Sequence, residues 1–176
     1  MERKLAAILA ADVVGYSKLM GADEGGTLAA LRAVRADLIS PQVEQSRGVI
    51  LKSMGDGWFI EFQSVTDAAS CALALQDALK TQSTIQLRIG LHIGEVTIAD
   101  EDIYGDGVNI AARLQELAVA GGIVVSDAAR RAMDGKLSLE FQDLGPHNLK
   151  NISEPVHAFG HGMGTAAAAS KLSEQE

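Results

Sequence analysis

The chain has 176 residues, enough for one domain with a buried core, and 47% of them are hydrophobic, which argues against global disorder. Its formal net charge of -8 argues against non-specific binding to nucleic acid or to an anionic membrane surface, although local cations and metal ions can still hold a nucleotide. The one cysteine, Cys71, excludes a disulfide framework within the chain and is consistent with a reducing, cytoplasmic location.

Hydrophobic periodicity and turn residues divide the first half of the chain into strands and helices. The predicted elements are a buried strand over 5–14, a helix over about 23–45 with Pro41 bending its last turn, strands over 48–53 and 58–62, and a helix from the N-cap Ser64 to about Lys80. The first segment is too short to cross a membrane, which needs roughly 20 apolar residues. Residues 54–57 predict a hairpin whose tip lies near Asp56.

The second half of the chain also alternates between predicted strands and helices. The predicted elements are a strand over 86–97, a helix from Gly107 to about Val119 capped by Asp106, a strand over 123–125, a short helix capped by Ser126 or Asp127, and strands over 137–141 and 156–159. This order predicts an α+β fold: a ferredoxin-like split βαβ core (βαββαβ) with a C-terminal αβ extension and a central, mostly antiparallel sheet. We expect one domain over 1–162 and a flexible tail over 163–176.

Two aspartates follow apolar strands. Asp12 ends the first strand, and Asp56 lies at the tip of the hairpin. The strands that carry them are neighbours in a split βαβ sheet, so both carboxylates can meet at one sheet end. Close carboxylates repel each other unless a cation lies between them, and hard oxygen ligands beside a phosphate favour Mg²⁺ or Mn²⁺. The alternative is that Asp12 is a helix or turn cap and Asp56 only a turn residue.

Two further segments suit phosphate binding. The loop that contains Val14, Gly15 and Tyr16 leads toward a helix and offers backbone N–H groups to phosphate oxygens, although it lacks the Walker pattern. Asn109 and Arg113 are four residues apart on one face of a predicted helix, where they can hold a ribose oxygen and a phosphate. A solvated helix face is the alternative explanation of this pair.

A lysine interrupts the apolar run that leads to the hairpin. Lys52 needs a partner there because an unpaired buried charge is costly, and Asp102, in the predicted turn before the third helix, is a candidate. Adenine presents a ring-nitrogen acceptor beside an amino donor, so a donating lysine and an accepting aspartate can recognise its edge. Guanine reverses part of that pattern.

Together these segments resemble the class III adenylyl and guanylyl cyclase catalytic domains. The resemblance covers about residues 5–160. It rests on several motifs in order, namely ADVVGYS (11–17), LKSMGDG (51–57), RIGLHIGEV (88–96), DIYGDGVNIAARL (102–114) and LKNISEPV (149–156). Any one of these motifs alone is weak, whereas their order and separation make the resemblance specific.

The resemblance implies an adenylate cyclase that forms cyclic AMP and pyrophosphate from ATP with two ions of Mg²⁺ or Mn²⁺ per site. It implies a head-to-tail homodimer in which each site takes metal carboxylates from one chain and base-recognising residues from the other. The implied roles are metal binding by Asp12, Asp56 and the Val13 carbonyl, adenine selection by Lys52 and Asp102, ribose orientation by Asn109, transition-state stabilisation by Arg113 and phosphate binding by Lys150.

Other interpretations remain open from the sequence. Diguanylate cyclases and polymerase palms use a similar sheet with paired carboxylates, but Lys52 and the Asn109–Arg113 helix fit them poorly. A module that only dimerises or binds nucleotide is a non-enzymatic alternative, and a guanylyl cyclase is another. We expect His92 to be structural and Trp58 to pack beside the hairpin.

Overall fold

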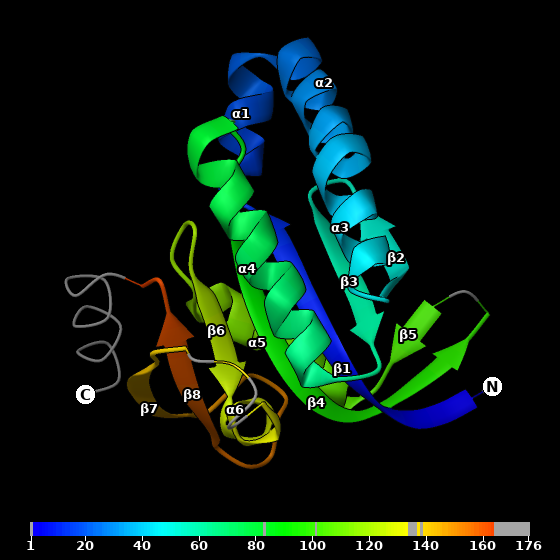
Figure 1. The fold of residues 1–176 in the computed structure, drawn as a ribbon, viewed down its shortest axis with the longest axis vertical. Helices are drawn as coiled ribbons and strands as arrows, with labels where there is room; N and C mark the ends of the chain where they lie inside the picture. The colour runs from blue at the N-terminus through cyan, green and yellow to red at the C-terminus, as the bar shows by residue number, and fades with distance from the viewer. Residues whose placement is uncertain (1, 83, 101, 134–136, 138, 164–176) are drawn as a thin grey trace.

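A mostly antiparallel sheet runs through the molecule and carries helices on both faces (Figure 1). The structure is a computed structural model that describes residues 2–163 except 83, 101, 134–136 and 138. In chain order its elements are β1 (Glu2–Val13), α1 (Tyr16–Ala22), α2 (Glu24–Val34), the π-helical turn η1 (Arg35–Ile39), α3 (Ser40–Gln45), β2 (Val49–Met54), β3 (Gly57–Phe62), α4 (Val65–Gln82), β4 (Leu87–Ala99), β5 (Asp102–Tyr104), α5 (Asp106–Leu117), β6 (Ile123–Ser126), α6 (Asp127–Ala132), β7 (Gln142–His147) and β8 (Val156–His161).

The sheet has the strand order that a split βαβ core requires. The order is β2-β3-β1-β4-β6-β8-β7, and β5 pairs with β4 outside this path. Strand β1 lies between β3 and β4 and is antiparallel to both. Strands β4 and β6 are parallel, whereas the other pairs among the described strands are antiparallel. The predicted α+β class and mostly antiparallel sheet are confirmed, and α5 to β8 form the C-terminal extension.

Strand β1 is apolar and buried from Ala6 to Ala11 because both faces of this part are covered. Leu9 and Ala11 belong to a core that includes residues of α2, η1, α3 and α4. Ile8 and Ala10 belong to a second core on the other face, which includes Ala111 of α5. A strand buried on both faces has no polar alternation, which explains why its sequence is a continuous apolar run. Figure 1 shows α4 crossing one face of the sheet.

Two predicted helix N-termini are confirmed by side-chain caps. Ser64 Oγ accepts from the Asp67 N–H at 3.1 Å, and Ser126 Oγ accepts from the Ala129 N–H at 3.1 Å. The helix expected over 23–45 is divided into α2, η1 and α3. The π-helical turn ends just before Pro41, and a proline has no N–H to continue the regular hydrogen-bond ladder.

The predicted cap of α5 is wrong. Gly105, with φ 116°, occupies the N-cap position, and Asp106 is already the first helical residue. A glycine reaches this φ without the steric cost that a side chain brings. Asp106 stabilises α5 in another way: it is an acidic residue in the first turn, where its negative charge interacts favourably with the positive end of the helix dipole.

The sequence analysis did not predict two of the elements. Helix α1 has seven residues and buries none of them fully, so it carries no apolar periodicity. Strand β5 has three residues and pairs with β4 through Asp102↔Ala99 and Tyr104↔Thr97. Asp102 therefore lies on a strand and not in a turn.

The last strands differ in part from the prediction. The strand expected over 137–141 is wrong: the described residues of that segment form no strand, and β7 begins only at Gln142. Its Pro146 resembles a turn residue in sequence, and an edge strand tolerates it because one row of its backbone groups is unpaired. The strand expected over 156–159 is confirmed as part of β8. Met163, assigned to the tail, is buried, and residues 164–176 lie outside the described part.

No helix in the described part of the chain combines the length and the apolar character needed to cross a membrane.

Candidate active site

Asp12 and Asp56 lie side by side at one end of the central strands. In the sheet register Asp12 is opposite Gly57, the residue after Asp56, so the end of β1 meets the hairpin between β2 and β3. The Val13 N–H donates to the Asp56 carbonyl oxygen at 2.8 Å and holds the two segments together. Both aspartates are partly buried. The expected convergence of the two carboxyl groups is therefore present within a single chain.

The electrostatics of this pair are unfavourable for two negative charges. Burial raises the pKa of Asp12 to about 6, and the charge of Asp56 and a hydrogen bond with Asp56 add to that effect. The Val13 N–H and the nearby Arg88 act in the opposite direction. Near pH 6 the Asp12 carboxyl group is therefore partly protonated, and a cation beside the two carboxyl groups would replace that proton.

The donor set fits a hard divalent cation. It consists of carboxylate oxygens, which Mg²⁺ and Mn²⁺ prefer, and the two carboxyl groups repel each other without a positive charge. Among the described residues no group of three or more His, Cys, Asp or Glu side chains is suitable for holding an ion. Mg²⁺ sites typically use one or two carboxylates together with water and substrate phosphates.

The loop after β1 is only partly available to a ligand. The N–H of Val13 donates to Asp56, and the N–H of Val14 donates to the Gln86 carbonyl oxygen at 2.9 Å. The expectation that Val14 offers its N–H to a phosphate is therefore wrong, because the sheet end already uses that group. Gly15, with φ 64°, then turns the chain into α1. The N–H groups of Gly15 and Tyr16 remain as the candidate donors of this loop.

Tyr16 also borders the hairpin turn. A Cβ atom placed on Gly55 would lie 3.4 Å from the Tyr16 hydroxyl oxygen, so the tyrosine ring reaches from the start of α1 to the residue before Asp56. The loop after β1 and the β2–β3 hairpin thus meet at two points, one through the backbone and one through this side chain.

Arg88 is a candidate site residue that the sequence analysis did not assign. It lies on β4 directly opposite Asp12, and its positive charge lowers the pKa of that carboxyl group. Its Nε atom is buried without a hydrogen-bond partner. The available signal was an arginine between the buried residues Leu87 and Ile89 in an otherwise apolar strand.

Lys52 and Asp102 form the pair that the sequence predicted. Lys52 Nζ lies 3.1 Å from Asp102 Oδ1, and the Ile103 N–H donates to the same oxygen at 2.8 Å. The Ile103 N–H, the Lys52 ammonium group and the Tyr104 hydroxyl hold the pKa of Asp102 below its ordinary value. Asp102 is therefore a carboxylate, and hence an acceptor, throughout the neutral range.

Asn109 and Arg113 lie on α5, as predicted. Asn109 is exposed, and Arg113 Nη1 donates to Glu116 Oε1 at 2.9 Å on the same helix. This ion pair is partly exposed and adds little to stability. Arg113 can leave Glu116 for a phosphate at a small cost.

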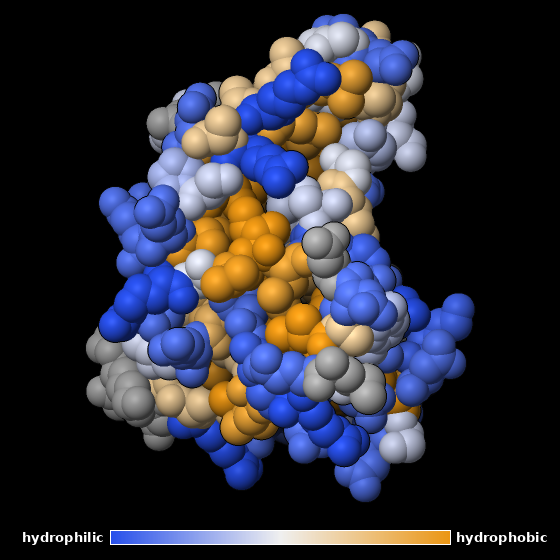
Figure 2. Space-filling model, turned by 90° about the vertical axis from the view of Figure 1, so that its right-hand side faces the viewer, coloured by the Kyte–Doolittle hydropathy of each residue, from blue (hydrophilic) through white to orange (hydrophobic). Residues whose placement is uncertain are grey.

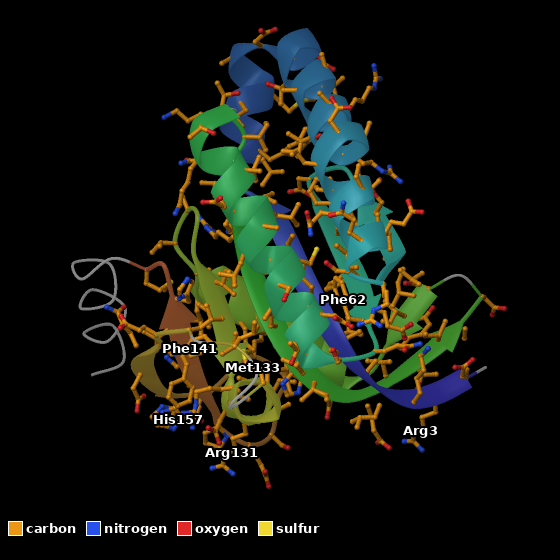
Figure 3. The ribbon with its side chains drawn as sticks, in the orientation of Figure 1. Arg3, Phe62, Arg131, Met133, Phe141 and His157 are labelled. Atoms are coloured by element: carbon orange, nitrogen blue, oxygen red, sulfur yellow. The ribbon has the colours of Figure 1, made fainter. Side chains whose placement is uncertain are left out.

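Lys150 is exposed in the connection between β7 and β8. That hairpin forms one edge of the sheet, with β4 and β6 between β8 and β1. Figure 3 shows the separation: Phe141 and His157, near that edge, lie across the sheet from Phe62 on β3. Within one chain the structure thus joins Asp12 with Asp56 and Lys52 with Asp102, while Lys150 lies at a distant edge.

Comparison with known proteins identifies one family. The family model described as the adenylate and guanylate cyclase catalytic domain matches residues 2–161 of this chain. A Rhizobium meliloti protein named "Putative adenylate cyclase 3" is 42% identical over 164 residues, which cover 89% of this chain and 28% of that protein. The chain spans only 28% to 35% of the length of the first curated relatives that it matches.

Solved structures agree with the sequence match. An adenylate/guanylate cyclase/hydrolase from Silicibacter pomeroyi has a TM-score of 0.84 and 40% identity, covering 91% of this chain and 97% of that one. The adenylyl cyclase CyaB from P. aeruginosa has a TM-score of 0.79 at 21% identity, covering 91% and 94% of the two chains, which supports the fold alone.

Proposed function

Because the chain belongs to the family of adenylate and guanylate cyclase catalytic domains, we propose that it converts ATP to cyclic AMP and pyrophosphate. The observation that carries the choice of ATP is the 3.1 Å ion pair between Lys52 and Asp102. In this proposal Lys52 donates to a ring nitrogen of adenine and Asp102 accepts from its amino group. Guanine has a carbonyl oxygen where adenine has the amino group, and that oxygen would face the Asp102 carboxylate.

The paired carboxylates supply the catalytic end of the proposed site. Asp12 and Asp56 would hold two ions of Mg²⁺ or Mn²⁺, with the Val13 carbonyl as a further ligand. Divalent metals are general in this family. When bound, the ions would acidify the ribose 3′-hydroxyl and balance negative charge on the phosphates. The hydrogen bond from the Val13 N–H to the Asp56 carbonyl oxygen supports this role because it fixes the backbone segments that carry both carboxyl groups before a ligand arrives.

The triphosphate is the part of the substrate that Arg88 and the loop after β1 would hold. Arg88 lies opposite Asp12, and its positive charge lowers the pKa of that carboxyl group, so its guanidinium group is placed beside the carboxylate pair where it would attract a phosphate. The N–H groups of Gly15 and Tyr16 would add neutral donors. Holding the chain of phosphates places the α-phosphorus for in-line attack by the 3′-hydroxyl, with pyrophosphate leaving on the opposite side.

A second copy of the chain would complete each site in a head-to-tail homodimer. Asn109 would orient the ribose and Arg113 would stabilise charge on the transition state, while Lys150 would reach the terminal phosphates. The observation that supports a shared site is the separation of Lys150 from the aspartate pair within one chain. An apolar area crosses the middle of the face in Figure 2, and exposed Val49, Met54 and Tyr104 offer apolar surface on β2 and β5.

A product assay with ATP and GTP in parallel, each with Mg²⁺ or Mn²⁺, tests the proposed function. We expect cyclic AMP from ATP and much less cyclic GMP from GTP, identified by mass spectrometry. Cyclic GMP as the main product would identify a guanylyl cyclase. No cyclic product over a range of metals and pH would favour a module that only dimerises or binds nucleotide.

A further inference from the structure

A cavity of about 480 Å³ lies between α4 and the strands β6 and β8. Helix α4 forms one side of it, and the turn before β6 and the end of β8 form the other (Figure 1). None of the residues assigned above to metal or nucleotide binding lines this cavity. Its lining combines apolar side chains with four polar ones, namely Gln76, Asp77, Lys80 and His161.

Gln76 is a buried residue that places a free acceptor at the cavity. It is 5% exposed, and its Nε2 atom donates to the carbonyl oxygens of Leu87 at 2.9 Å and Gly122 at 3.0 Å. Carbonyl oxygens only accept, so these two bonds fix the orientation of the amide group and use both of its N–H donors. No described residue donates to Gln76 Oε1, which is therefore left for a ligand.

His161 supplies a second acceptor from the opposite side. Its Nδ1 atom lies 3.0 Å from the Glu140 carbonyl oxygen, so Nδ1 carries the proton of the neutral ring and Nε2 is an acceptor. An edge-on contact with Phe141, with ring centroids 6.2 Å apart, further restricts the ring. The Asp77 carboxylate on α4 is the third acceptor at this cavity.

Asp77 and Lys80 bring opposite charges to the same cavity. They are three residues apart on α4, yet neither belongs to an ion pair among the described residues. Leu73, four residues before Asp77, shares their helix face and begins the apolar part of the lining. Three helical residues span about 4.5 Å along the axis, so one small molecule can contact both charges.

We propose that this cavity binds a small zwitterion with an apolar side chain, of the class of the free amino acids. The ligand's ammonium group has three donors, which meet the three acceptors Gln76 Oε1, His161 Nε2 and the Asp77 carboxylate. Its carboxylate pairs with the Lys80 ammonium group. Its side chain packs against the apolar part of the lining, which includes Leu73. The site is independent of the cyclase reaction.

L-Leucine is a suitable probe because it has both charged groups and a branched apolar side chain. It is titrated into the protein without nucleotide or metal, and NMR follows the amide signals of Gly121 and Gly162, which line the cavity. We expect both signals to shift saturably, with a dissociation constant on the order of 1 mM for so small a ligand. Shifts confined to Gly15 and Gly57, beside the aspartate pair, or no saturable shift at all, would overturn the proposal.

Two analogues of leucine test whether both charges are recognised. Isopentylamine keeps the side chain and the ammonium group but has no carboxylate, and isocaproate keeps the side chain and the carboxylate but has no ammonium group. Each should bind about fivefold more weakly than leucine, because one charged contact is lost. An analogue that binds as tightly as leucine would overturn the zwitterion as the ligand class.

Two substitutions assign the charged contacts to residues. Asp77→Asn and Lys80→Gln each remove one charge at an exposed position of α4, where folding is retained. Each should weaken leucine binding by about twofold to fivefold, as for a solvent-exposed ion pair. Asp77→Asn should leave isocaproate binding unchanged, and Lys80→Gln should leave isopentylamine binding unchanged. Glu44→Gln, at an exposed position of α3, is the control and should bind leucine like the wild type. Wild-type leucine affinity in both α4 variants would overturn the proposed site.

Discussion

The N–H of Val13 donates to the carbonyl oxygen of Asp56 at 2.8 Å, and this bond fixes the end of β1 against the β2–β3 hairpin. The side chains next to this bond are those of Asp12 and Asp56, so the backbone forces together two carboxyl groups that would otherwise repel. The fold holds this arrangement at an energetic cost that a bound cation would relieve. The pair is thus preorganised for a ligand that carries positive charge.

The affinity for divalent cations should fall as the pH is lowered through about 6. Burial and the neighbouring Asp56 raise the pKa of Asp12 to about 6, so protons and cations compete for the pair in that range. Mn²⁺ binding can be followed from pH 5 to 8 by the fluorescence of Trp58, the single tryptophan, which lies two residues after Asp56. Constant affinity over this range would contradict the proposed metal site.

Asp56→Ala is the matching loss-of-function variant for this experiment. It should abolish the fluorescence response and lower the cyclase rate at least about 10²-fold, because a metal ligand is removed. Asp77→Ala, which removes an exposed carboxylate on α4, serves as the control and should leave both unchanged.

Two inactive variants should restore activity when they are mixed, if each site is shared between two chains. In an equal mixture of Asp12→Ala and Arg113→Ala chains, half of the dimers are mixed and each has one intact site. About a quarter of the wild-type activity is therefore expected. A mixture of Asp12→Ala with Asp56→Ala should stay inactive, since both changes affect the same set of ligands. Absence of recovery at every mixing ratio of the first pair would exclude shared sites.

The sequence predicted the core of the fold and the paired residues because these leave periodic or compositional signals. Asp12 follows a long apolar run, and Lys52 is a charge inside another, so both are visible without a structure. Strand β5 was missed because three residues cannot establish a period.

Residues that depend on pairing across the sheet were harder to predict. Arg88 gains its importance from lying opposite Asp12, which only the register between β1 and β4 reveals. Val14 was assigned to phosphate binding because loops expose N–H groups, but Gln86 accepts its bond. Periodicity therefore identified the elements, while tertiary hydrogen bonds decided which of their groups remain free.

Acid should destabilise the protein partly through His92. Burial lowers the pKa of His92 to about 4, and its Nδ1 lies 2.7 Å from Ser126 Oγ, the cap of α6. An unfolded histidine takes up its proton near pH 6.5, before the folded one does. The contribution of neutral His92 to the free energy of unfolding is therefore complete above about pH 6.5. It falls by at most about 3 kcal/mol as the pH is lowered toward 4.

Urea unfolding of the wild type and His92→Gln between pH 7 and 4.5 measures this effect. The raised pKa of Asp12 acts in the opposite direction, because the folded form then holds a proton that the unfolded form releases between about pH 4 and 6. The effect of Asp12 on the free energy of unfolding is common to both proteins, so it cancels when the two free energies are subtracted. The stability advantage of the wild type over the variant should shrink as the pH falls, and an advantage that does not change with pH would contradict the prediction.

Substitution of Gly90 by alanine should disturb the contact that places α5 on the sheet. A Cβ atom at this position of β4 would lie against the Ala111 carbonyl oxygen and 2.5 Å from the Gln115 backbone nitrogen, both on α5. Backbone atoms cannot rotate away as a side chain can, so the helix must shift, and we expect a loss of about 1–3 kcal/mol in the free energy of unfolding.

Gly25→Ala is the control for this prediction, since a Cβ atom there meets no atom within 4 Å and alanine favours the helix. Its urea midpoint should equal or exceed that of the wild type. Because α5 carries Asn109 and Arg113, a shift of this helix in Gly90→Ala should also lower the cyclase rate at temperatures where the variant is still folded. A normal rate together with reduced stability would show that the position of α5 tolerates more variation than the proposed roles of these two residues allow.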